Sequence, residues 1–232
     1  MKAVIFDWGG TLTPWVTMDM RAGWQIYADI VHADDPEQAK VIAEALLAAD
    51  NAAWSRCRAE ATAFSLSHVL TEVGVPEHEA AWAAYRAFWD QATYTDPEVT
   101  PLMTELRARG LRTGVLSSTS WPGTWHEEIL IRDNVRHLFD ACVWSSDLEY
   151  TKPHPKSFEA AMHAIGIDDP ADCVYVGDRP HDDINGAKSA GMKAILIPHS
   201  DIPEDQLVPV DVEPDAILHR LSDLPEILDS WS

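Results

Sequence analysis

Residues 3–13 read AVIFDWGGTLT, an apolar run followed by a carboxylate and a pair of glycines. A short apolar run that is bounded by a turn signal is typical of a buried strand. The strand ends at Asp7, and Gly9 and Gly10 free the backbone behind it to approach a ligand. The stretch therefore predicts a buried strand that carries a carboxylate at its carboxyl end.

Further segments downstream end in groups of the same chemical kind. Residues 174–178 (VYVGD) form another apolar strand that ends on glycine and a carboxylate, and residues 115–118 (VLSS) end on hydroxyls. Residues 150–153 (YTKP) supply the ammonium group of Lys152. Open α/β sheets bind ligands at the carboxyl ends of their strands. The segments therefore predict a site that combines a nucleophile, a hydroxyl, an ammonium group and a metal-binding carboxylate.

The order of apolar and helical segments predicts the fold class. Segments of helical period, such as 101–106 and 158–162, alternate with short runs rich in Val, Ile or Leu. This alternation predicts an α/β fold in which a doubly wound parallel sheet carries helices on both faces. The expected strands are residues 2–6, 112–117, 141–145, 173–176 and 194–197.

Residues 14–98 interrupt this alternation. They carry Ala, Glu and Trp at helical spacing, as in 39–49 and 80–89, without a strand pattern. We interpret them as an all-helical insertion, here called the helical cap, in a core made of residues 1–13 and 99–232. Near the other end of the chain, the proline- and acid-rich stretch 198–214 predicts a surface loop before a last short element at 216–217. Tryptophans in or near the cap are expected mainly in its core, with one or two at the substrate mouth: Trp15, Trp24, Trp54, Trp82 and Trp89.

Taken together, these motifs resemble the haloacid dehalogenase (HAD) superfamily of hydrolases, and the resemblance covers nearly the whole chain. One such motif alone is a weak signal, but four in order with helical spacers are a strong one. The cap resembles the helical cap of the family's first subclass. The first family motif is Asp-x-Asp-Gly-Thr, and the others are a strand ending in Ser or Thr, a Lys before Pro, and Gly-Asp followed by another acid. The matching positions are 7–11, Ser117 with Ser118 in place of a frequent Asn, Lys152-Pro153, and Gly177-Asp178 with Asp183.

The resemblance implies a phosphatase in which Asp7 attacks phosphorus and forms an aspartyl-phosphate. It also implies Mg²⁺ as cofactor, because this hard ion neutralises phosphoryl charge and prefers oxygen ligands. The implied metal ligands are Asp7, the backbone carbonyl of Gly9 and Asp178, with Asp183 or Asp182 acting through the coordination shell. A carbonyl ligand at position 9 survives any change of the side chain there.

The substrate contacts are implied by the same resemblance. Ser117 and the amide of Ser118 hold the transferring oxygens, and the turn at Gly10 and Thr11 contributes to phosphate binding. Lys152 pairs with Asp7 and with the phosphoryl group, where it stabilises the charge that spreads during transfer. The expected substrate is a small phosphorylated metabolite.

Gly9 is the main departure from the family pattern. It replaces the aspartate that protonates the leaving group and later activates water in ordinary members. General acid–base assistance contributes about 10²–10⁴ in rate, or roughly 3–5 kcal/mol of barrier. His181, Asp182, Thr11 or a cap residue are alternatives for this role, and the sequence does not choose among them.

Three other readings stay open. Phosphonoacetaldehyde hydrolases share an Asp-Trp-small-Gly-Thr stretch, but they need a cap lysine, and the cap contains only Lys40. Dehalogenases need no metal and usually replace the Gly-Asp of the fourth motif, which is intact here. A dehalogenase would also need a cap arginine for the substrate carboxylate. The third reading is a catalytically weak phosphate-binding or interaction module. Arg21, Arg56 and Arg58 of the cap leave the arginine requirement of a dehalogenase open.

Composition narrows the classes of partner. The formal net charge is −21, with six lysines and no basic run, which argues against nucleic-acid binding. No run approaches the roughly 18 apolar residues that would span a membrane, and the start of the chain does not resemble a cleaved signal peptide. We therefore expect a cytoplasmic enzyme, monomeric or homodimeric, that binds a small molecule. We expect the cysteines to be buried and to pack as apolar side chains, and we expect His126, His154 and His181 to be polar loop residues. Neither the cysteines nor these histidines have the spacing of metal ligands.

Overall fold

The computed structural model describes residues 1–198 and 208–231. In this part of the chain, six parallel strands form one sheet in the order β3-β2-β1-β4-β5-β6. Phe6, the last residue of β1, pairs with Val115 of β2 and Val176 of β4. Asp7 therefore leaves the sheet between two neighbouring strands. The strands are β1 (Ala3–Phe6), β2 (Arg112–Ser117), β3 (Ala141–Trp144), β4 (Cys173–Gly177), β5 (Lys193–Leu196) and β6 (Ala216–Ile217).

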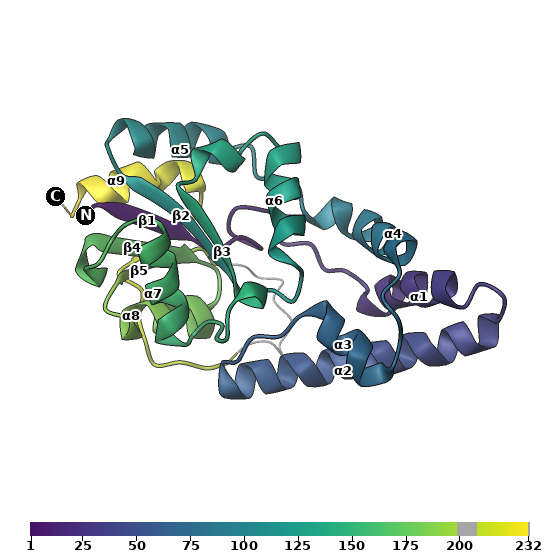
Figure 1. Cartoon of the computed structure of the whole chain (residues 1–232). Helices are drawn as coiled ribbons and strands as arrows, with labels where there is room; N and C mark the ends of the chain where they lie inside the picture. Colours follow the sequence, from purple (N-terminus) through teal and green to yellow (C-terminus); the bar gives the residue numbers. More distant parts are fainter. Residues whose placement is uncertain (199–207, 232) are drawn as a thin grey trace.

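Helices cover both faces of the sheet (Figure 1). Successive side chains of a strand point to opposite faces, so Val4 and Phe6 pack with α5, α6 and α9, while Ala3 and Ile5 pack with α7 and α8. The predicted doubly wound α/β fold is confirmed. The core helices are α5 (Val99–Ala108), α6 (Gly123–Arg132), α7 (Pro155–Ala164), α8 (Gly186–Ser189) and α9 (Leu224–Asp229). Short 3₁₀ helices are Asp90–Ala92, Arg136–Leu138, Ser145–Asp147, Pro170–Asp172 and Leu221–Asp223, and Pro180–Asn185 form a π-helical turn.

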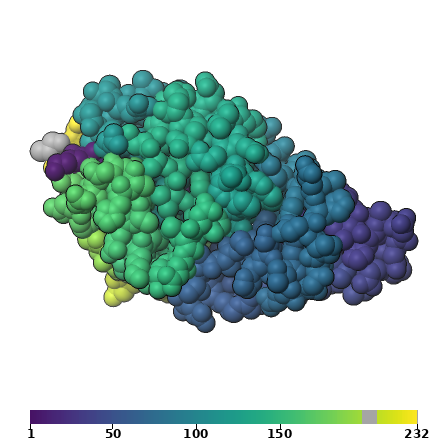
Figure 2. Space-filling model, in the orientation of Figure 1, coloured from purple at the N-terminus to yellow at the C-terminus, as the bar shows by residue number. Residues whose placement is uncertain are grey.

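The chain between β1 and α5 is helical and projects from one end of the sheet (Figures 1 and 2). Its longest helix begins after Asp35, whose carboxylate accepts a hydrogen bond from the amide of Gln38, and ends at Ala61 in a left-handed conformation. Trp24, Tyr27 and Tyr85 are fully buried in a core of these helices' own. The helices are α1 (Met20–Val31), α2 (Pro36–Glu60), α3 (Leu66–Val73) and α4 (Glu79–Trp89).

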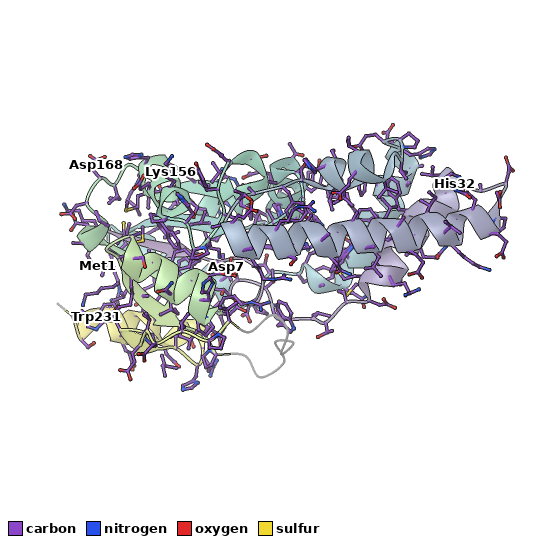
Figure 3. All side chains as sticks on the ribbon, turned by 90° about the horizontal axis from the view of Figure 1, so that it is seen from below. Met1, Asp7, His32, Lys156, Asp168 and Trp231 are labelled. Carbon is purple, nitrogen blue, oxygen red and sulfur yellow. The ribbon has the colours of Figure 1, made fainter. Side chains whose placement is uncertain are left out.

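Backbone hydrogen bonds join the segment after α2 to the core. The amide of Ala63 donates to the carbonyl of Glu149 at 3.0 Å, and the amide of Thr151 donates to the carbonyl of Ala61 at 3.0 Å. The amide of Leu66 donates to the carbonyl of Ser120 at 2.9 Å. The carboxyl end of α2 is therefore held over the carboxyl edge of the sheet, whereas the loop between α1 and α2, marked by His32, lies far from Asp7 (Figure 3).

The observed strands agree closely with the apolar runs of the sequence. β2 has the predicted bounds, and β1, β3, β4 and β5 differ from their predicted ranges by a residue at one or both ends. The predicted surface loop 198–214 lies partly outside the described residues, because 199–207 are not described. Within the described ranges, no helix has both the length and the apolar character needed to cross a bilayer.

Candidate active site

The carboxyl edge of the sheet opens into a cavity of about 590 Å³ between the core and the helical cap. β1 lies where the strand order reverses, with β2 on one side and β4 on the other, which is the position where doubly wound sheets bind ligands. Thr11 and Asp183 are close to this edge but do not line the cavity. The predicted site residues that do line it are Asp7, Gly9, Gly10, Ser117, Ser118, Lys152 and Asp178.

Lys152 is held at the bottom of the site by a set of buried partners. Its Nζ donates to Oδ1 of Asp7 at 2.7 Å, to Oδ1 of Asp183 at 2.6 Å and to the hydroxyl of Tyr175 at 2.9 Å. The Tyr175 hydroxyl in turn donates to the carbonyl of Leu116 at 2.7 Å. Burial opposes the charge on Lys152, but Asp183 and Asp7 outweigh it and raise its pKa. The ammonium group is therefore charged and fixed against Asp7.

The carboxylates of Asp7, Asp178 and Asp183 lie together, with one oxygen from each within 4.8 Å of the others. Neither oxygen of Asp178 has a hydrogen-bond partner among the described residues, although Nε of Arg179 lies 3.4 Å from its Oδ2. Burial raises the pKa of Asp178 well above its usual value, and the charges of Asp7 and Asp183 raise it further. Buried carboxylate oxygens without donors suit a hard divalent cation. The cluster therefore fits the expected metal.

The π-helical turn after β4 determines which of two adjacent acids joins this cluster. Oδ2 of Asp183 accepts a hydrogen bond from the amide of Arg179 at 2.8 Å, and burial raises its pKa although Lys152 partly offsets that effect. Asp183 packs so closely that a Cβ on Gly177 would lie 2.4 Å from it, which requires glycine there. Asp182 lies at the cavity wall instead, with its Oδ1 2.8 Å from Nδ1 of His181.

The turn that follows Asp7 wraps around the carbonyl of Trp8, which accepts from the amides of Leu12 and Thr13 at 2.9 and 3.0 Å. Gly10 has φ 84°, in the left-handed region that favours glycine. Gly9 does not lie in that region, and no heavy atom would lie within 4 Å of a Cβ built there. Neither the backbone nor the neighbouring atoms require glycine at position 9. A side chain at position 9 would therefore enter open space.

The hydroxyl-bearing loop after β2 is tied to the loop that carries Lys152. Ser117 is buried at the end of β2, and Oγ of Ser118 accepts from the hydroxyl of Thr151 at 2.7 Å. The amide of Thr119 donates to Oγ of Ser145 at 2.8 Å, which fixes the next turn of the loop. The predicted phosphate-contacting residues are therefore brought together with Lys152.

His126 is not a loop residue, and that prediction is wrong. It lies on α6, stacks on Trp144 with ring centroids 4.2 Å apart, and stacks on Trp121 at 5.6 Å. Its Nε2 is 2.9 Å from Oγ1 of Thr119. Burial lowers the pKa of His126 to about 3, so the ring is neutral. Tryptophans from separate elements create this burial, and a single histidine in a sequence gives no sign of it.

Asp50 is a cavity residue that sequence reasoning did not single out. It is 1% exposed on α2; its Oδ2 accepts from Nε1 of Trp24 at 3.0 Å, and its Oδ1 has no partner among the described residues. Burial raises its pKa from 3.8 to about 6. A signal existed, because Asp50 falls between Leu46 and Ala53 at the spacing of one helix face. Trp24 lies in the cap core, whereas Trp15, Trp54 and Trp89 line the cavity.

The alternative reactions would need a lysine or an arginine of the cap at the cavity. Lys40 is exposed and pairs with Glu37 at 2.7 Å, and it does not line the cavity. Arg21 pairs with Glu44 and Arg56 with Glu72 on the surface. Arg58 lines the cavity. The position of Lys40 argues against a Schiff-base reaction, and Arg58 is the cap arginine that a carboxylate substrate could reach.

The chain is similar in sequence to known hydrolases. The family model of haloacid dehalogenase-like hydrolases matches residues 1–191. Over 133 residues, the chain is 36% identical to a glyceraldehyde 3-phosphate phosphatase from Methanopyrus kandleri, covering 56% of each chain. The chain thus spans about half the length of the curated relatives that it matches first.

Solved structures resemble the chain over its whole length. A HAD phosphatase from Thermococcus onnurineus superimposes with a TM-score of 0.69 at 21% identity, over 98% of both chains. A 2-haloacid dehalogenase from Pseudomonas syringae pv. tomato superimposes with a TM-score of 0.68 at 28% identity, over 100% of both chains. The family match, the sheet order and the buried Asp7–Lys152 pair lead to one conclusion: the chain belongs to the haloacid dehalogenase-like hydrolases.

Proposed function

We propose that the protein hydrolyses the phosphate ester of a small metabolite through Asp7. The observation that supports this most is the buried Lys152, which holds Oδ1 of Asp7 at 2.7 Å beside the carboxylates of Asp178 and Asp183. Such a site combines a fixed nucleophile with charges that compensate a phosphoryl group. The relative from Methanopyrus kandleri bears the name of a phosphatase, which supports the same reaction class.

In the first step, a carboxylate oxygen of Asp7 attacks phosphorus, and the bond between phosphorus and the leaving oxygen breaks. In the second step, water attacks the phosphorus of the aspartyl-phosphate, which releases inorganic phosphate and restores Asp7. Lys152 keeps the Asp7 carboxylate oriented and stabilises negative charge on the phosphoryl oxygens. Ser117, the amide of Ser118 and the turn at Gly10 and Thr11 would hold those oxygens at the edge of the sheet.

A divalent cation, for which we propose Mg²⁺, would be held by Asp7, Asp178 and the carbonyl of Gly9, with Asp183 acting through the coordination shell. When bound, it would neutralise charge on the phosphoryl oxygens. The donor-free oxygens of the buried Asp178 support this assignment. Asp183 has the further task of orienting Lys152, to which it is hydrogen-bonded at 2.6 Å.

The open space at Gly9 bears on the kind of substrate. Without an acid at this position, an alkoxide leaving group departs without a proton from the usual source, which lowers the rate by about 10²–10⁴. We propose that the preferred substrate has a leaving group that needs no proton, or that it fills the space beside Gly9 with a group of its own. The lack of any heavy atom within 4 Å of a Cβ at this position supports both versions of this proposal.

We further propose that residues 14–98 act as a cap subdomain on a core of residues 1–13 and 99–232. The hydrophobic cluster around Trp24, Leu46 and Tyr85 supports this, because it is built by cap helices and is separate from the clusters on the two faces of the sheet. The cap contributes a large part of the cavity wall, including Asp50, Trp54 and Arg58. It would therefore select the substrate.

Carbon–halogen cleavage is a second candidate, because Arg58 lines the cavity and the full-length resemblance to a 2-haloacid dehalogenase reaches 28% identity. A screen of phosphorylated metabolites for phosphate release, with and without Mg²⁺, separates the two when halide release from 2-haloacids is measured in parallel without metal. We expect Mg²⁺-dependent phosphate release. Metal-independent halide release with no phosphate release would reverse the assignment, and no turnover of either class, activated aryl phosphates included, would leave a binding module.

A further inference from the structure

One face of α2 forms a wall of the active-site cavity, and this face gives the cavity two chemically different ends. Asp50, Trp54 and Cys57 follow one another at the i, i+4 and i+7 spacing of a helix face, and all line the cavity. Cys57 lies close enough to Asp182 of the core for that charge to affect its thiol. Asp50 lies about 10 Å further along the helix axis. The cavity therefore extends from the phosphate-binding edge of the sheet into the cap.

Asp50 brings an uncompensated carboxylate to the inner end. Its Oδ2 accepts from Trp24, but its Oδ1 has no hydrogen-bond partner among the described residues. Tyr85, the titratable neighbour on α4 that its charge affects, is also buried and remains neutral because burial raises its pKa. Burial brings the pKa of Asp50 only to about 6, so the carboxylate is mostly ionised at pH 7. An ionised carboxylate in an apolar surrounding is costly unless a cation compensates it.

Three aromatic rings also line the cavity, and one of them, Tyr85, lies close enough to Asp50 for that charge to affect its hydroxyl. The ring centroids of Tyr85, Trp89 and Trp121 lie between 5.7 and 6.3 Å from one another, and all of these residues line the cavity. The rings are inclined to one another by 46–82°, so they form walls that meet at an angle and not a parallel stack. Inclined aromatic walls with electron-rich faces attract organic cations, and quaternary ammonium groups in particular.

We propose that the inner end of the cavity, formed by Asp50, Tyr85, Trp89 and Trp121, binds an organic ammonium group. The substrate class would then be a phosphate ester that carries a primary amine or a quaternary ammonium group away from the phosphate. This substrate class rests on the proposed function, whereas the ammonium site itself does not. The net charge of −21 also favours the approach of a cation. A second anionic group on the substrate would be repelled by the charge of Asp50 at this end.

Binding of a cation and of its neutral isostere tests the site directly. The probes are choline and 3,3-dimethylbutan-1-ol, which differ by one charge, and each is titrated into the full chain by calorimetry at pH 7.5. We expect choline to bind at least about tenfold more tightly, from the cation–π and charge interactions. Equal affinities in the parent protein would overturn the proposal, as would tighter binding of the anionic analogue 3,3-dimethylbutanoate.

Variants identify the residues that are responsible. Asp50→Asn keeps an acceptor for Trp24 and removes the charge, so the preference for choline should fall to within about twofold of the neutral probe. Asp182→Asn is the matched control, because it removes a carboxylate from the other end of the same cavity and should leave the preference intact. Trp89→Leu tests the aromatic wall independently. Full preference retained in a folded Asp50→Asn protein would contradict the assignment.

Turnover of 4-(aminomethyl)phenyl phosphate against 4-methylphenyl phosphate, both with a leaving group that needs no proton, connects the site with the reaction. The ratio of kcat/KM should favour the amine by at least about tenfold in the parent and approach one in Asp50→Asn. If no phosphate ester is hydrolysed at all, the proposed function fails, and the choline titration still decides the ammonium site. If both esters are hydrolysed equally by the parent, the phosphatase assignment stands and the proposed substrate class is wrong.

Discussion

Oδ1 of Asp7 lies 2.7 Å from Nζ of Lys152, although 145 residues separate them in the chain. The contact joins the end of β1 to the loop before α7, and Asp183 from the turn after β4 completes it at 2.6 Å. Asp7 is therefore positioned by parts of the chain that meet only at the carboxyl edge of the sheet.

Asp7→Asn should lower turnover by at least about 10³-fold, because the amide cannot attack phosphorus and no other described carboxylate occupies its position. Phosphate binding should largely persist, since Ser117 and Lys152 remain. Steady-state kinetics and phosphate titration measure the two effects, and the melting temperature controls for folding. Activity within about tenfold of the parent is incompatible with Asp7 as nucleophile.

Mg²⁺ should raise the melting temperature of the parent, because a ligand of the folded state stabilises it by about 2.7 kcal/mol at a hundred times its Kd. Asp178→Ala should lose this response, since it removes the donor-free carboxylate of the cluster. Asp182→Ala is the matched control, because its carboxylate lies outside the cluster and pairs with His181. Calorimetry that shows unchanged Mg²⁺ affinity in Asp178→Ala would count against the metal site.

Gly9→Asp should fold normally and accelerate alkyl-phosphate hydrolysis by up to about 10²–10⁴-fold. An aspartate at position 9 would be neither strained nor crowded, because the backbone there is not left-handed and no heavy atom would lie within 4 Å of the new Cβ. The gain should be much smaller for an aryl phosphate, whose leaving group needs no proton. The measurement is kcat/KM for one alkyl and one aryl phosphate in both proteins.

Alanine substitutions separate the effects of backbone and chemistry in this turn. Gly9→Ala should be neutral or stabilising by up to about 1 kcal/mol, because the conformation suits an L-residue. Gly10→Ala should destabilise by more than about 1 kcal/mol, since φ is 84°. Denaturant unfolding measures both.

A stable Gly9→Asp protein with no selective gain on the alkyl ester would contradict the prediction for Gly9→Asp. It would show that the site is specialised and has not merely lost an acid.

Asp50→Asn should change the pH dependence of stability. The pKa of Asp50 is about 6 when folded and 3.8 as a free group, so the folded state binds the proton more tightly. Stability of the parent therefore falls as pH rises from about 4 to 6, and above pH 6 the ionised carboxylate costs up to about 3 kcal/mol. Asp50→Asn should exceed the parent in stability by up to this amount at pH 7–8 and match it below pH 4. Parallel unfolding curves at all pH values would show that Asp50 titrates normally.

The sequence predicted the sheet well, and it predicted which side chains gather at its carboxyl edge, for a physical reason. Buried parallel strands are continuous apolar runs, so β1 and β2 could be placed within a residue. Parallel strands end at one edge of a sheet, so Asp7, Ser117 and Asp178 had to meet once the strands were placed. The long-range contacts of Lys152 then followed from the family resemblance and not from periodicity.

The residues that were missed depend on neighbours from other elements. His126 is buried because Trp121 and Trp144 stack on it, and Tyr175 reaches Lys152 from a strand position that reads as simple core. Asp50 lies in an alanine-rich helix, where a carboxylate ordinarily faces solvent. The helix-face spacing hinted at its position, but the partner Trp24 lies 26 residues earlier. The burial of these residues depends on packing between separate elements, and a local sequence pattern does not reveal such packing.

The chain leaves the sheet at Asp7 and returns to it only through α5. Any segment inserted at this point must start within a few residues of Asp7 and end beside it, whatever its own sequence. The architecture thus places any insertion at this point over the carboxyl edge of the sheet. We expect exchange of residues 14–98 to alter which molecules reach the cavity, while the strands, Lys152 and the carboxylates need no change. In this topology we therefore expect specificity and chemistry to be carried by different stretches of the chain.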